Sequence, residues 1–171
     1  MKTIPTKINK YNVYNQGNRL LGTGDEVTLP SFEASSETVS GAGVLGEFDD
    51  PTVGYFSNME QEIPFRVLDQ EAVDMLDQTK AVQLELRGAQ QTTDSNGDIE
   101  FRPMRVVVRG RMAGFDPGKV KAGNGMETSV KLTILYILIE LEDQPMVELD
   151  KINEVFKIRG VDVLAKIKEM C

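Results

Sequence analysis

The stretch that decides the fold is Val82-Gln83-Leu84-Glu85-Leu86-Arg87, in which apolar side chains alternate with polar or charged ones. This period of two predicts a half-buried antiparallel strand. Its predicted partner, residues 99–112, follows the turn Asp94-Ser95-Asn96-Gly97-Asp98. Asn-Gly favours a tight hairpin because both residues tolerate positive φ. In the partner strand, one face carries Met104, Val106, Val108 and Met112, and the other carries Arg105, Val107, Arg109 and Arg111.

Further strands are predicted on both sides of this hairpin. The segment Ile134-Leu135-Tyr136-Ile137-Leu138-Ile139 is apolar on both faces. We expect it to form the centre of the core, covered by a helix on one side and by a sheet or another subunit on the other. Shorter strand patterns occur at residues 26–30, 32–39, 146–150 and 155–158.

Two helices complete the predicted elements. Leu68, Ala72, Val73 and Leu76 recur at helical spacing, with Asp69 placed to cap the first turn. A short closing helix is expected over residues 162–170, with Asp162 at its start. The chain is therefore expected to be one mainly β domain, residues 1–171. We expect an antiparallel barrel or sandwich with one mid-chain helix and a short C-terminal helix.

Two glycine-rich segments, residues 41–61 and 113–128, interrupt the strand patterns and are expected to be loops. The first is unusually apolar for a solvent-exposed loop, and a long irregular segment inside a compact domain is often functional. We expect it to contact other subunits. Its candidate contact residues are Val44, Leu45, Phe48, Val53, Tyr55, Phe56 and Met59.

The composition excludes several kinds of chemistry. The 171 residues include no histidine and one cysteine, Cys171, so mechanisms built on imidazole and zinc sites of the His/Cys kind lack their parts. One thiol cannot form an internal disulfide, in keeping with a reducing compartment. No apolar run is long enough for a membrane helix, and the N-terminus has no signal-peptide pattern, so no membrane anchor is expected.

The formal net charge is −8, and the charges are unevenly distributed. Residues 1–100 hold 7 basic and 17 acidic groups, whereas residues 101–171 hold 12 basic and 10 acidic groups. The first part cannot grip a phosphate backbone, because such binding requires clustered Lys and Arg. Arg105, Arg109 and Arg111 have two readings: a hydrated sheet face, or a subunit interface that faces acidic groups of a neighbour.

Three short motifs resemble ligand-binding loops but lack the necessary context. Gly41–Gly46 has dinucleotide-loop spacing, but Asp49-Asp50-Pro51 stands where a helix should run. The loop at residues 114–120 is one residue too short for a phosphate loop, and the Asp94–Asp98 turn lacks the calcium-loop glycine and glutamate positions. We therefore expect no catalytic residues, no cofactor and no metal site.

The order of several segments along the chain resembles the major tail tube protein of contractile-tailed bacteriophages and of R-type phage-tail-like bacteriocins. The likeness rests on residues 11–17 with Gly22, residues 26–30, and Glu37 followed by Gly41-Ala42-Gly43. Its most specific part is Tyr136 followed by residues 146–156 and by Gly160-Val161-Asp162-Val163-Leu164.

The resemblance implies a structural, non-enzymatic subunit that forms hexameric rings, which stack into a hollow tube inside a contractile sheath. The expected partners are other copies of the chain, the sheath, the baseplate and tail-terminator proteins, and DNA that passes through the lumen without tight binding. The subunit would be made in the bacterial cytoplasm and would end in the virion tail. The alternatives are the tube of a bacteriocin or secretion-type injector without DNA cargo and, more distantly, a small β-barrel ligand-binding protein or enzyme.

An acidic lumen would suit such a tube. Six copies carry 6 × −8 = −48 formal charges, which would repel DNA phosphates so that DNA slides without sticking. The lumen-lining candidates are Glu33, Ser35 and Glu37, on a strand with no good core face.

Overall fold

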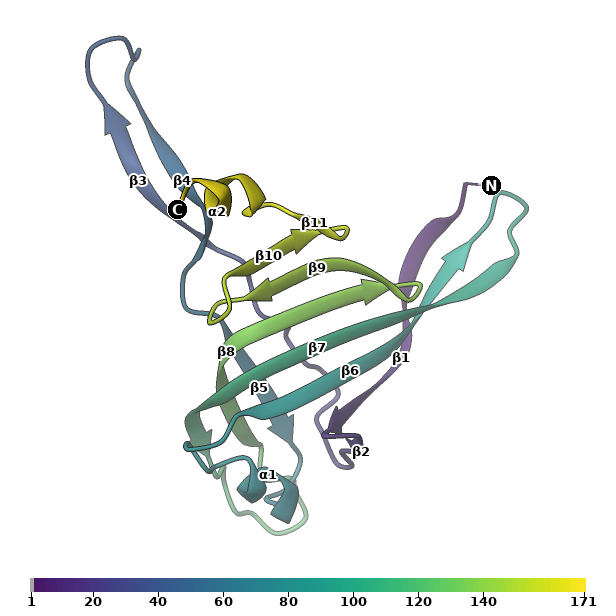
Figure 1. The fold of residues 1–171 in the computed structure, drawn as a ribbon. Coiled ribbons are helices and arrows are strands. Elements are labelled where there is room, and N and C mark those ends of the chain that lie inside the picture. Colours follow the sequence, from purple (N-terminus) through teal and green to yellow (C-terminus); the bar gives the residue numbers. More distant parts are fainter. Residues whose placement is uncertain (1) are drawn as a thin grey trace.

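The computed structural model describes residues 2–171 and contains a long antiparallel sheet, a projecting two-stranded arm and two short helices (Figure 1). The prediction of a mainly β, antiparallel fold is confirmed. In chain order the elements are β1 (Ile4–Asn15), β2 (Asn18–Arg19), β3 (Ala34–Ser40), β4 (Glu47–Phe56), β5 (Glu60–Phe65), α1 (Gln70–Asp74), β6 (Val82–Thr93), β7 (Ile99–Asp116), β8 (Thr128–Leu141), β9 (Gln144–Asp150), β10 (Val155–Ile158), β11 (Val161–Asp162) and α2 (Ala165–Met170).

The β6–β7 hairpin forms where the sequence predicts it. Its pairing runs from Val82 opposite Gly110 to Thr93 opposite Ile99. At the turn, Gly97 has φ 92°, and the Asp94 carboxylate accepts hydrogen bonds from the main-chain N–H groups of residues 96 and 98 at 2.8 and 2.9 Å. The local turn chemistry therefore fixes the register between β6 and β7.

The main sheet is open, with strand order β11-β10-β9-β8-β7-β6-β1-β2. β8 lies near its centre and has two partners on one edge, because β5 pairs with residues 128–133 and β9 with residues 136–141. The sequence predicted a barrel or a sandwich. In the described part of the single chain, the first and last strands of this order are not paired with each other, so the sheet does not close into a barrel. At one end of the sheet, β1 pairs with β6 through two register shifts, between Pro5 and Lys7 and between Ile8 and Lys10.

The core lies between one face of β6–β8 and the elements packed on it, β5 and α1. Its side chains include Ile63, Phe65, Ala72, Met75, Leu84, Val106, Val108, Val130, Leu132, Ile134, Ile137 and Leu149. The other face of β8 is half-buried within the single chain, so the expected cover of this face by another subunit stays a prediction. Met59 also belongs to the core: it is 1% exposed, and its carbonyl accepts a hydrogen bond from the Ile134 N–H at 2.8 Å. Its prediction as a surface contact residue is therefore corrected.

A glycine is required where β7 meets β8. A Cβ atom at Gly110 would lie 2.2 Å from the carbonyl oxygen of Thr133, which is inside van der Waals contact. The β7–β8 pairing shifts register at this point, between Arg109 and Gly110. Gly110 thus permits the backbones of β7 and β8 to approach closely at the register shift.

Residues 41–61 differ from the expected loop. Residues 47–56 form β4, which pairs with β3 to make the arm that projects from the sheet (Figure 1), and only residues 41–46 form the turn between these strands. The alternation of β4 is obscured by Asp49-Asp50-Pro51 and by a register shift between Ala34 and Ser36. The second expected loop is also shorter, because β7 continues to Asp116.

Two other local predictions need correction, and one strand was missed. Residues 26–30 are not a strand, although Val27 packs against the core. The mid-chain helix α1 begins after its predicted cap Asp69, but it ends at Asp74 and buries Ala72, while Leu68 and Val73 are exposed. β1 was not predicted. Within residues 2–171, neither helix is long and apolar enough to cross a membrane.

Candidate functional site

The arm, β3–β4 with its turn, carries several large exposed apolar side chains. Leu45 at the turn is fully exposed, and large exposed apolar side chains follow along β4. They are Phe48, Val53 and Tyr55, all three among the predicted contact residues. Exposed apolar side chains gathered on one projection indicate an interaction surface.

Aromatic packing anchors the base of the arm. Phe56, the last residue of β4, makes edge-to-face contacts with Phe32 and Phe156, with ring centroids 5.6 and 5.1 Å apart. Such pairs add roughly 0.5–1.5 kcal/mol to the effect of burial. Phe56 is thus partly buried and is an anchor of the arm as much as a contact residue.

A lysine also fixes the arm base. The ammonium group of Lys151, just after β9, donates to the carbonyl oxygens of Ser57 at 2.9 Å and Phe56 at 3.5 Å. Partial burial lowers the pKa of Lys151 below its ordinary value. The preceding Asp150 shapes this turn by accepting main-chain hydrogen bonds from Ile152 and Asn153, each at 3.0 Å. Burial raises the pKa of Asp150, but these bonds and the Asn153 side chain outweigh it, so the pKa lies below its usual value.

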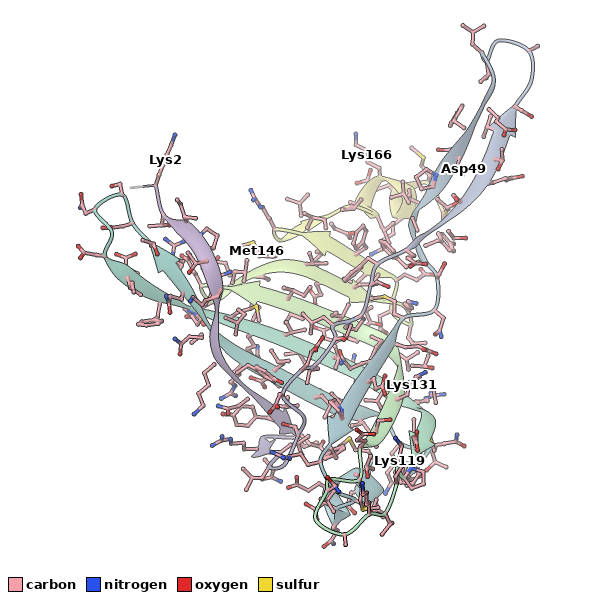
Figure 2. All side chains as sticks on the ribbon, turned by 180° about the vertical axis from the view of Figure 1, so that it is seen from behind. Lys2, Asp49, Lys119, Lys131, Met146 and Lys166 are labelled. Carbon is pink, nitrogen blue, oxygen red and sulfur yellow. The ribbon has the colours of Figure 1, made fainter. Side chains whose placement is uncertain are left out.

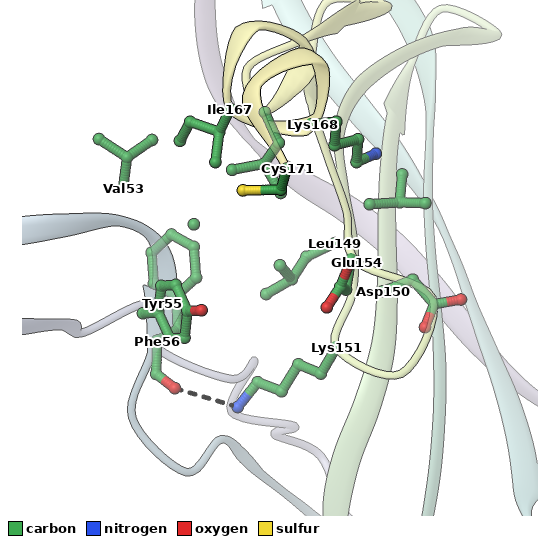
Figure 3. Close-up of a pocket in the computed structure, with 13 residues that line it drawn as sticks. Val53, Tyr55, Phe56, Leu149, Asp150, Lys151, Glu154, Ile167, Lys168 and Cys171 are labelled. Carbon is green, nitrogen blue, oxygen red and sulfur yellow. Dashed lines mark hydrogen bonds between the residues drawn. The ribbon is translucent and has the colours of Figure 1, made fainter.

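A pocket lies between the arm base and the C-terminal helix (Figure 3). It has a volume of about 400 Å³, and most of its walls are apolar, formed by Val53, Tyr55, Leu149, Leu164 and Ile167 together with Cys171. A Cβ atom at Gly54, which has φ +80°, would lie 2.6 Å from a methyl carbon of Leu164. The arm and the segment before α2 therefore pack directly against each other.

The arginines find carboxylates within their own chain. Arg105 donates from Nε to Glu85 and from Nη1 to Glu140, each at 2.7 Å. Arg109 lies 3.5 Å from Asp150, and its guanidinium carbon lies 4.7 Å from the Tyr136 ring centroid. These contacts favour the hydrated sheet face over a subunit interface for both side chains. Arg111 is exposed.

These ion pairs shift the titration of their neighbours. Hydrogen bonds from Arg105, and more weakly from Arg87, lower the pKa of Glu85 despite its partial burial. Burial and the nearby Glu148, which accepts a hydrogen bond from the Tyr136 hydroxyl at 3.1 Å, raise the pKa of Tyr136 to about 12. The face is a connected polar layer with Val107 buried within it.

A family model described as phage tail tube protein FII matches residues 5–170. The chain belongs to this family. It is also 26% identical, over 170 residues and 94% of each chain, to the tail tube protein of Escherichia phage P2. These similarities confirm the resemblance noted in the sequence and identify a subunit of the phage tail tube, a structural component of the virion tail.

In this tail tube protein, the three lumen candidates lie together at the start of the arm. Ser35 and Glu37 belong to β3, and Glu33 directly precedes it; all three are exposed. The carbonyl of Glu33 accepts a hydrogen bond from the Ser57 N–H at 2.8 Å, which closes the arm base. That they face a lumen remains a prediction.

Sequence reasoning missed the pocket and the Lys151 contact. Leu149, Leu164 and Ile167 come from separate segments, and no local period connects them with the arm. The signal that could have pointed to the pocket is a pair of apolar side chains at the C-terminal helix, Leu164 just before it and Ile167 within it, although this helix is too short to need an apolar face toward a core. Among residues 2–171 there is no cluster of three or more side chains suited to hold a metal ion.

Proposed function

We propose that this tail tube subunit assembles into hexameric rings that stack into the inner tube of a contractile tail, and that DNA passes through this tube during ejection. The observation that carries the proposal is the projecting arm, whose exposed apolar side chains lack cover in the isolated subunit. Such a surface is stable in water when other copies bury it.

The open sheet supports lateral assembly. Within the described chain, the outer edge of β1 pairs only with the two-residue β2. The main-chain donors and acceptors along the rest of this edge of the 12-residue strand are therefore free to pair with another strand. Free strand edges favour pairing with another strand. We propose that neighbours in the ring cover such edges and that the arm makes the contacts between rings, through Val44, Leu45, Phe48, Val53, Tyr55 and the exposed part of Phe56.

The lumen is proposed to be acidic, with Glu33, Ser35 and Glu37 among its lining residues. Repulsion between these carboxylates and DNA phosphates would keep DNA moving. The Glu33→Lys/Glu37→Lys double variant should slow DNA ejection from assembled particles. Glu33→Gln/Glu37→Gln is the matched control that removes charge without reversing it, and unchanged ejection kinetics in the lysine variant would contradict the lumen assignment.

The sheath, the baseplate and the tail-terminator proteins are the proposed further partners, and the subunit itself is proposed to be non-catalytic. A tube without DNA cargo, as in a bacteriocin, would use the same contacts between copies; neighbouring genes for a sheath with or without a capsid distinguish the two cases.

Negative-stain electron microscopy of the purified chain tests the assembly directly. Rings or rods are expected as the concentration is raised. Monomers that persist at high concentration, with a melting temperature that shifts with a small ligand, would overturn the proposal and favour a binding protein.

A further inference from the structure

We propose that the pocket beside α2 receives the arm tip of a second copy of the chain, with Leu45 as the inserted side chain. This inference rests on the proposed function, because it names the acceptor for the arm within the tube. Two surfaces of the same chain carry it: the tip of the arm and the pocket at its base.

The tip is a preformed projection. Gly43 and Gly46, with φ of 91° and 95°, hold the turn between β3 and β4, and the Val44 N–H donates to the Gly41 carbonyl at 3.1 Å. Leu45 stands fully exposed on this turn. A turn that is already ordered loses little conformational entropy on docking, which favours affinity.

The pocket is suited to an apolar side chain. Leu149, Leu164 and Ile167 line it, and Figure 3 shows Val53, Leu149 and Ile167 around the same space. Its volume of about 400 Å³ exceeds the roughly 150 Å³ in which an apolar cavity holds a benzene-sized group. A leucine side chain with its neighbouring turn atoms can therefore occupy it.

The occupant must come from another copy. Val53 and Tyr55, at the base of the arm, form part of the pocket wall, whereas the turn lies at the far end of the same hairpin (Figure 1). Leu45 is fully exposed, so it does not pack on its own chain. A chain thus presents both a tip and a separate receptor for it.

Charge complementarity favours this pairing. The side chains of residues 34–56 include four acidic groups and no basic group, a net charge of −4. Those of residues 151–171 include five basic and three acidic groups, a net charge of +2. Asp49 lies on the arm and Lys166 on α2 (Figure 2). The pocket lining itself is balanced, with Asp150 and Glu154 beside Lys151 and Lys168, so the net positive charge belongs to the segment around the pocket. Opposite charges on the arm and on this segment steer one toward the other.

A contact between two different surfaces of one chain is heterologous, and it propagates where the rotation between copies does not close into a ring. Each copy that accepts a tip still offers its own, and copies add in one direction without closing in pairs. The contact therefore gives the stack of rings a polarity, because all arms point toward the same end of the tube.

Disulfide trapping tests the contact with a thiol that the chain already has. Cys171 lines the pocket, so the Leu45→Cys variant places a second thiol on the proposed occupant. Mild oxidation of assembled rods should give a ladder of covalent oligomers beyond the dimer on a non-reducing gel. Ser95→Cys, at the exposed turn between β6 and β7, is the matched control and should give no ladder. The Leu45→Cys/Cys171→Ser variant should also give none.

A second set of variants tests the contact without oxidation. Leu45→Asp and Ile167→Asp should each abolish rods, whereas Val120→Asp, at another exposed apolar position, should assemble like the parent chain. The melting temperature of each free subunit checks that it is folded. Rods from Leu45→Asp at parental concentrations, or trapped rods that yield no ladder, would overturn the pocket assignment and leave the tube intact. Failure of the parent chain to form rods would instead overturn the proposed function itself.

Discussion

The ammonium nitrogen of Lys151 lies 2.9 Å from the main-chain carbonyl oxygen of Ser57, and this hydrogen bond ties the turn after β9 to the base of the arm. The two residues are 94 positions apart in the chain. Together with the aromatic contacts of Phe56, this bond makes the arm a fixed projection of the sheet.

Lys151→Met should loosen the arm base. The variant keeps much of the aliphatic length of the side chain but removes the donor to the carbonyls of residues 56 and 57. We expect a loss of about 1 kcal/mol in the free energy of unfolding and faster hydrogen exchange in β4. Lys166→Met, at an exposed position of α2, is the control. Equal exchange in β4 in both variants would contradict the anchoring role.

Gly110→Ala should disrupt the β7–β8 pairing. The added methyl group would meet the Thr133 carbonyl at 2.2 Å, and both atoms belong to rigid backbone. Because the strands must separate, we expect destabilisation of about 3 kcal/mol or more, measured by urea unfolding. Gly114→Ala is the matched control in the same strand, since its nearest neighbour would be Lys131 Cβ at 3.7 Å. Similar stabilities for the two variants would contradict the close approach.

Gly54→Ala should push the arm away from the segment before α2. The substitution adds the strain of a positive φ and a clash with Leu164 at 2.6 Å. Gly43→Ala, with φ +91° and open space around the added methyl, bears the strain alone. We expect Gly54→Ala to be the more destabilising of the two, by about 1–2 kcal/mol in thermal unfolding. Adding Leu164→Ala should relieve part of that excess; no relief would show that the contact is not the cause.

Glu85 should make stability depend on pH. Hydrogen bonds from Arg105 keep its pKa in the folded chain below the ordinary value of 4.5. Its stabilising effect is therefore fully present above the unfolded-state pKa and is lost as the pH falls through the lower folded-state pKa. Discounted for the partial exposure of Arg105, we expect Glu85→Gln to cost about 1 kcal/mol at about pH 7, and less at about pH 3.

The measurement for Glu85 is urea unfolding of the parent chain and the variant at both pH values. Glu47→Gln, at an exposed position of the arm, is the control for the loss of one carboxylate. A difference between the parent chain and Glu85→Gln that stays constant between the two pH values would contradict the ion-pair account.

The β6–β7 hairpin was predictable because its information is local. The alternation at residues 82–87 and the Asn96-Gly97 turn specify both faces and the register within about 30 residues of chain. The closing helix was also predicted, and the structure places it at residues 165–170. Its predicted start was wrong, because Asp162 belongs to β11 and the helix begins after Leu164. In the arm, the strand predicted at residues 32–39 corresponds to β3, but β4 was not predicted, because its side chains are largely exposed and no burial imposes a period on it.

The candidate site could be predicted only in part, because many of its contacts join residues far apart in the sequence. The sequence predicted apolar contact residues from Val44 to Met59. Met59 is buried instead, because it lies directly before β5, which enters the core. The carboxylates that pair with Arg105 lie 20 and 35 residues away, so their presence in the same chain follows only from strand register. The pocket likewise requires segments whose proximity no local pattern encodes.

The two irregularities of β1 have a consequence for handling the free subunit. An edge strand that contains Pro5, Lys7 and Lys10 and breaks step twice is a poor template for indiscriminate cross-β stacking. Concentrated solutions of the free subunit should therefore resist conversion to amyloid, and no fibrils that bind an amyloid dye should form. The irregular edge of β1 thus disfavours fibril formation, although neighbouring subunits in an ordered ring can still cover it.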